Sequence, residues 1–108
     1  MSYRVLPTPP FTAKLGRLAK KYPSLANEMR ELGNRLATIP TEGQPLGRNC
    51  YKIRIAIKSK GKGKSGGARI ITYVHVRNAI VYLLSIYDKS EDDTITDAEL
   101  TKLLKLLP

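Results

Sequence analysis

The hydrophobic positions follow a helical period in the first third of the chain. Two stripes recur every three or four residues, the first at Phe11, Leu15, Leu18, Ala19 and Tyr22 and the second at Leu25, Met29, Leu32 and Leu36. Thr8 is the expected N-cap of the first helix, and Pro23 separates that helix from a second N-cap at Ser24. The pattern predicts a helical hairpin, preceded by a short strand at residues 3–6.

The period changes to two after a Pro- and Gly-containing stretch, residues 38–49, which is predicted to be a loop. One side of the next strand carries Tyr51, Ile53, Ile55 and Ile57, and the other side carries Lys52, Arg54, Ala56 and Lys58. Residues 68–76 and 79–87 are apolar and β-branched enough for central strands, joined by a tight turn at Arg77 and Asn78.

A last helix is predicted near the end of the sequence. Thr96 and Glu99 have the spacing of a capping box, and an apolar stripe follows at Leu100, Leu103, Leu104 and Leu107. The order predicts one α+β domain over residues 1–108, with an N-terminal helical hairpin packed on a small antiparallel sheet and a C-terminal helix. The hairpin is expected to cover the isoleucine face of the sheet and leave the basic face open.

The charge pattern indicates the class of function. The chain has 108 residues and a net charge of +10, and no Asp or Glu occurs between residues 43 and 87. Seven of the 19 Lys and Arg residues lie in a single block, at Lys52, Arg54, Lys58, Lys60, Lys62, Lys64 and Arg69. An uncompensated block of this kind is expected to face a polyanion, and nucleic acid is the favoured one.

The block contains two kinds of cation. Lys52, Arg54 and Arg69 project from strands, so that the backbone fixes their direction and they form a platform suited to phosphoryl chemistry. The lysines between residues 58 and 64 alternate with glycine and serine, which predicts a mobile basic loop that closes over a nucleic-acid backbone. The alternative is a solvated hairpin tip whose lysines only aid solubility.

Other candidate chemistry is sparse. His75 is the only histidine, and one histidine cannot supply both the acid and the base of a two-histidine nuclease. Cys50 is the only cysteine, so that neither an intrachain disulfide nor a thiol metal cluster is expected. We expect no cofactor and no metal, and no apolar run approaches the ~20 residues of a membrane span. A reduced, cytoplasmic setting is expected.

Three segments carry a resemblance to a known family: residues 51–54 with the Lys/Gly loop, residues 66–71 and residues 82–89. In these the sequence resembles the RelE/ParE superfamily of toxins from type II toxin-antitoxin systems, and most closely its RelE and HigB-type members. The resemblance implies the RelE-like microbial RNase fold and a ribosome-dependent mRNA endonuclease, in which a ribose 2′-OH attacks the adjacent phosphate without a metal. It also implies a cognate antitoxin protein as partner, beside the ribosome and mRNA.

The resemblance implies roles for individual residues. Lys52, Arg54, Lys64, Arg69 and Lys89 are expected to be catalytic, with the arginines as phosphate clamps and Lys89 as a leaving-group acid or stabiliser. The general base stays open among Lys52, Lys62 and Lys64, because no tyrosine follows Tyr87 where RelE-type toxins have one. Lys58, Lys60 and Lys62 are expected to bind RNA.

Two other functions remain open at this point. One is a toxin of the ParE branch, which poisons DNA gyrase, and the other is a non-catalytic RNA-binding module. The basic strand pair argues against the first. The second would tolerate Arg69→Ala with only a partial loss of affinity.

Overall fold

The computed structural model describes residues 2–61, 63, 66–91 and 94–108 and combines a five-stranded sheet with three α-helices. Along the chain the elements are β1 (Arg4–Pro7), α1 (Pro9–Lys21), α2 (Leu25–Thr38), β2 (Gln44–Gly47), β3 (Cys50–Ile55), a single 3₁₀ turn η1 (Lys58–Lys60), β4 (Ala68–His75), β5 (Ile80–Asp88) and α3 (Asp97–Lys105). The strand order in the sheet is β1-β5-β4-β3-β2.

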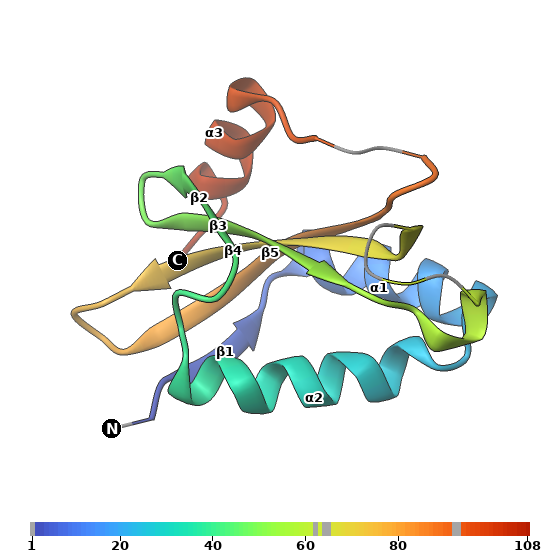
Figure 1. Cartoon of the computed structure of the whole chain (residues 1–108). Coiled ribbons are helices and arrows are strands. Elements are labelled where there is room, and N and C mark those ends of the chain that lie inside the picture. The colour runs from blue at the N-terminus through green and yellow to red at the C-terminus, as the bar shows by residue number, and fades with distance from the viewer. Residues whose placement is uncertain (1, 62, 64–65, 92–93) are drawn as a thin grey trace.

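The sheet separates two apolar cores, with the α1–α2 hairpin on one side and α3 on the other (Figure 1). The larger core packs the isoleucines of β3 and the following residue Ile57 against side chains of the hairpin that include Phe11, Leu25 and Leu32. The predicted hairpin on the isoleucine face is therefore confirmed. The smaller core lies beneath α3 and is built around Cys50, Ile71, Leu84 and Leu100.

The sheet is mixed, which corrects the prediction of an antiparallel one. β2 to β5 pair antiparallel with their neighbours, but β1 runs parallel to β5 from Arg4 opposite Ile80 to Pro7 opposite Leu83. The chain leaves β1 through the two helices and returns to the sheet at its opposite edge, as β2, so that no hairpin joins β1 to β5. The direction of such a distant pairing is not encoded in a four-residue strand.

The segment predicted as a loop, residues 38–49, contains the edge strand β2. A two-residue turn joins β2 to β3, with φ of 56° at Arg48 and 62° at Asn49, as in the tight turns that suit the twist of a hairpin. Gly43 precedes the strand with φ of 106°, and a Cβ there would lie 2.6 Å from the carbonyl oxygen of Lys52. Prolines and glycines therefore shape an edge strand here, where they are tolerated.

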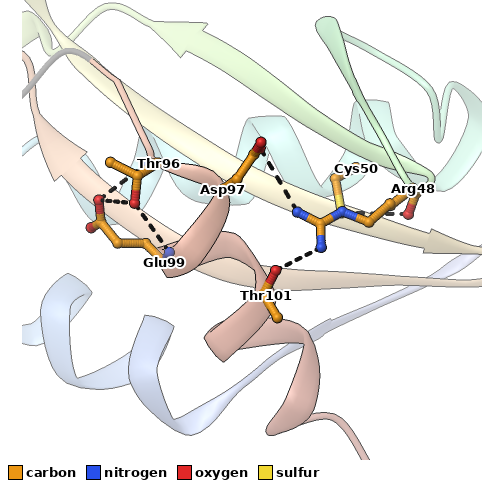
Figure 2. A network of polar contacts seen from close by, with 6 residues as sticks. All are labelled: Arg48, Cys50, Thr96, Asp97, Glu99 and Thr101. Atoms are coloured by element: carbon orange, nitrogen blue, oxygen red, sulfur yellow. Dashed lines mark hydrogen bonds and ion pairs between the residues drawn. The ribbon is translucent and has the colours of Figure 1, made fainter.

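The capping box of α3 is confirmed and the helix is further tied to the sheet (Figure 2). The Glu99 backbone N–H donates to Thr96 Oγ1 at 3.1 Å, and the Thr96 N–H donates to Glu99 Oε1 at 3.2 Å. Arg48 Nη1 donates to Thr101 Oγ1 at 2.7 Å, which connects the β2–β3 turn to the helix. Thr8 and Ser24 occupy the predicted N-cap positions, but neither side chain makes a capping hydrogen bond.

Within the described residues, no helix is both long and apolar enough to cross a lipid bilayer.

Candidate functional site

A row of three side chains crosses the sheet at the end of β3, the start of β4 and the end of β5. Arg54 lies directly opposite Arg69, and Arg69 lies directly opposite Tyr87. Directly opposed residues point to the same face of a sheet. The two strand arginines predicted as one platform are therefore neighbours, with Tyr87 as the third member of the row.

The two arginines differ sharply in burial. Arg54 is exposed, whereas Arg69 is only 2% exposed and donates through Nη1 to the carbonyl oxygen of Ala68 at 3.1 Å. Arg69 does not lie on an open face as predicted, because β4 is the central strand and both of its neighbours flank this position. Arg54 is thus the arginine of the pair that solvent can reach.

Lys52 lies one row further along β3, and its Cα faces Ile71 of β4. The side chain is half-buried and lines, with Arg54 and Glu42, a hollow of about 480 Å³ beside the β2–β3 hairpin. The predicted basic strand pair is brought together as expected.

Lys89 directly follows β5 and reaches the same end of the sheet. Its backbone N–H donates to the carbonyl oxygen of Gly67 at 3.0 Å, and the side chain is half-buried. A Cβ at Gly67 would lie 1.9 Å from the carbonyl oxygen of Ile55. Gly67 therefore allows the close approach of two backbones.

The basic loop begins as an anchored turn. The backbone N–H of Lys58 donates to Glu28 Oε2 at 2.7 Å, and that of Ser59 donates to Ser24 Oγ at 2.9 Å. Both acceptors belong to the start of α2 or its cap, so the turn is held to the helical hairpin. The exposed Lys58 side chain lines a small hollow together with Arg54. Lys62 and Lys64, also predicted as site residues, lie outside the described residues.

Lys60 belongs to a buried polar network that converges on Asp88. Its ammonium lies 2.5 Å from Asp88 Oδ1, and the exposed fractions of the two side chains are 11% and 0%. The Tyr22 hydroxyl donates to Asp88 Oδ2 at 2.7 Å, and the Ser90 backbone N–H donates to Oδ1 at 3.0 Å. Lys60 is consequently held in an ion pair and is not the flexible, solvated charge that the sequence predicted.

This network controls the charge of Asp88. Burial acts to raise the pKa of the carboxyl, but the hydrogen bonds from Lys60, Tyr22 and Ser90 outweigh it and hold the pKa well below its ordinary value of 3.8. Asp88 is therefore a buried carboxylate that joins α1, η1 and the end of β5.

A second group of cations, on α1, was not predicted from the sequence. Lys14, Arg17 and Lys21 line a cavity of about 420 Å³ between α1 and the end of β5, where Tyr87 and Glu91 are also lining residues. The available signal was the sequence of α1 itself, which contains four Lys and Arg but no Asp or Glu. The spacing of the three lining cations places them on one side of the helix.

The single histidine and cysteine are structural. His75 Nδ1 accepts from the Asn78 backbone N–H at 3.2 Å and so supports the β4–β5 turn. Cys50 is 1% exposed, and burial raises the pKa of its thiol to about 11. Tyr73 and Tyr82 stack on each other at the smaller core. The described residues include no group of three His, Cys, Asp or Glu that could hold a metal ion.

Comparisons with known proteins agree with this architecture. A family model described as the RelE toxin of the RelE / RelB toxin-antitoxin system matches residues 13–107. The chain belongs to the RelE toxin family.

A solved structure shows the same fold. It is the free state of an E. coli RelE toxin in which two arginines are replaced by alanine, with a TM-score of 0.61 and 15% sequence identity over 98% of this chain and 94% of that chain. Membership of the RelE family makes this protein a toxin of a toxin-antitoxin system and implies an antitoxin as its partner.

Proposed function

We propose that this RelE-family toxin is a ribosome-dependent mRNA endonuclease that needs no metal ion. In the proposed reaction a ribose 2′-oxygen attacks the adjacent phosphorus, and the bond from phosphorus to the 5′-oxygen of the next nucleotide breaks. A base takes the proton of the 2′-OH and an acid protonates the departing 5′-oxygen. The products are a 2′,3′-cyclic phosphate and a 5′-hydroxyl.

The observation that supports this proposal best is the direct opposition of Arg54 and Arg69. Like charges directly across a strand pair are destabilising, and Arg69 is nearly fully buried as well. A bound anion would offset the repulsion between the two arginines, so such a pair is suited to an anion-binding site. Guanidinium groups match the paired oxygens of a phosphate, and fixed donors stabilise the negative charge that grows in the transition state.

We assign the contact with the scissile phosphate to the exposed Arg54, with Arg69 stabilising the same charge from beneath. Lys52 is beside Arg54 on β3 and is proposed as general base or second stabiliser. Lys89 is proposed as the leaving-group acid. Lys64 keeps its proposed catalytic role, and Lys58 and Lys62 are proposed to contribute affinity for RNA as point charges.

The test is induced expression of the toxin without an antitoxin, followed by mapping of RNA ends. We expect growth arrest and mRNA fragments with 2′,3′-cyclic or 3′-phosphate ends, and neither with Arg54→Ala. With purified components, cleavage should require ribosomes and should persist in EDTA under conditions where control ribosomes remain active. Intact transcripts with broken DNA would favour the gyrase alternative, and intact transcripts without growth arrest would reject both.

A further inference from the structure

The cavity between α1 and β5 adjoins the candidate site. Tyr87 belongs to the transverse row with Arg69 and Arg54, and it also lines the cavity of about 420 Å³ beside Lys14 and Arg17. The candidate site and the cavity therefore share Tyr87.

The cavity lies beside the part of β5 that β1 does not cover. β1 pairs with β5 only as far as Leu83, where Thr8 Oγ1 donates to the Leu83 carbonyl oxygen at 2.8 Å. Beyond this point α1 packs beside the remainder of β5. A helix cannot fill the edge of a sheet as closely as a strand does, so a hollow of ligand size remains.

Three of the residues that line the cavity are cations, and all three come from the same helix. Lys14, Arg17 and Lys21 come from α1, and Lys14 Nζ also donates to Ser85 Oγ at 3.1 Å. Two carboxylates lie among the lining residues. Asp88 is engaged by Lys60 and Tyr22, whereas Glu91 is exposed at the rim.

We infer that this cavity is a nucleotide subsite, which holds the RNA residue next to the scissile phosphate. Tyr87 offers an aromatic ring for its base, and Arg17 and Lys21 offer charge for its phosphate. The volume suits one nucleotide. The inference rests on the proposed endonuclease function and adds α1 as a second wall of the site.

The proposed contact of Arg17 and Lys21 with a phosphate is tested by a double substitution with a matched control. Arg17→Gln with Lys21→Gln removes two exposed cavity cations, while Lys20→Gln with Arg77→Gln removes one lysine and one arginine elsewhere. Binding is measured to ribosomes programmed with an mRNA that carries 2′-deoxyribose at the cleavage position, which cannot be cut. We expect the cavity variant to bind at least about fivefold more weakly and with a flatter salt dependence than the control.

The proposed stacking of a base on Tyr87 is tested by combining substitutions of Tyr87 with an abasic nucleotide in the RNA. An abasic nucleotide is placed in turn on each side of the cleavage position. At one of the two positions the unmodified toxin and Tyr87→Phe should lose about tenfold in affinity, as expected for a lost base-aromatic stack. Tyr87→Leu should bind weakly to both RNAs and show no further loss on the abasic one.

The outcomes separate this inference from the proposed function. Equal binding of the two double variants, or equal abasic penalties for Tyr87→Phe and Tyr87→Leu, would overturn the subsite even if Arg54→Ala abolishes cleavage. If the cavity variant binds programmed ribosomes normally but loses affinity for the antitoxin, the surface serves that partner and the subsite is again refuted. Absence of cleavage by the unmodified toxin would refute the proposed function, while the binding measurements remain interpretable.

Discussion

The cations of β3 and those of the following turn look alike in the sequence but differ in their surroundings. Lys52 and Arg54 alternate with isoleucines that are buried under the helical hairpin, so that their side chains are directed to the opposite face. Lys58 and Lys60 continue the same alternation, yet the chain has already left the sheet and formed η1. Lys60 is thereby turned inward, onto the buried carboxylate of Asp88.

The comparison shows that charge density alone does not identify a binding residue. What decides the role of each lysine is whether the backbone directs it to solvent or to a buried acid. We therefore assign phosphate chemistry to the strand cations and structural anchoring to Lys60, and four predictions test this division.

The largest effect is expected for Arg54→Ala. Removal of one positioned donor to a charged transition state lowers the rate by about a hundredfold to a thousandfold. Because Arg54 is exposed, the free energy of unfolding should change by only about 0.5 kcal/mol or less. Single-turnover cleavage and denaturant unfolding check the two parts. A large loss of folding free energy that accompanies the loss of cleavage rate would show that Arg54 is a structural residue.

Lys60→Met is expected to lower the stability of the fold and to leave the cleavage rate of the folded protein nearly unchanged. It leaves the fully buried Asp88 carboxylate without its ion-pair partner, which costs about 3 kcal/mol of folding free energy. Lys58→Met, two residues earlier and exposed, is the matched control and should cost about 0.5 kcal/mol or less. Urea unfolding of both variants measures the difference. Equal stabilities would mean that the ion pair contributes nothing to the fold.

The network around Asp88 predicts a stability that depends on acid pH. Folding lowers the pKa of this carboxyl below 3.8, so that the stabilisation is complete above that value and is lost as the pH falls below it toward the lowered pKa. Asp88→Asn should be less stable at neutral pH and should lose less stability than the unmodified protein on acidification. Parallel pH curves for the two proteins would contradict the assignment.

A smaller effect is expected for Tyr22→Phe, which removes one hydrogen bond to the Asp88 carboxylate and keeps the ring against Lys60. The loss should be about 1.5 kcal/mol, as for other hydrogen bonds to charged groups. Tyr51→Phe is a suitable control, since Tyr51 packs against the same core from β3. A double-mutant cycle with Lys60→Met should show coupling between the two residues.

Much of the fold could be predicted because its elements have strong local signals. The two helical stripes, the isoleucine alternation and the capping box at Thr96 all describe interactions within a few residues. β2 was missed because its prolines and glycines are turn residues that an edge strand tolerates. The parallel pairing of β1 was missed because it depends on the path of the whole chain.

The candidate site could be predicted only where backbone periodicity determined it. The pairing of Arg54 with Arg69 follows from the register of two predicted strands, but the burial of Arg69 depends on which strand is central. Arg69→Ala would for that reason combine a rate effect with a loss of stability, so that Arg54 is the cleaner probe. The Lys60–Asp88 pair joins residues that are 28 positions apart, and no local pattern relates them.

The central claim is that strand cations carry the chemistry while Lys60 anchors the fold, and one measurement tests it most directly. Single-turnover mRNA cleavage on saturating ribosomes is compared for Arg54→Ala and Lys60→Met, with each rate divided by the folded fraction of that variant. We predict that the rate per folded molecule falls about a hundredfold or more for Arg54→Ala and stays within about threefold of the unmodified toxin for Lys60→Met. A folded Lys60→Met protein that cannot cleave, beside an Arg54→Ala protein that cleaves normally, would contradict the account.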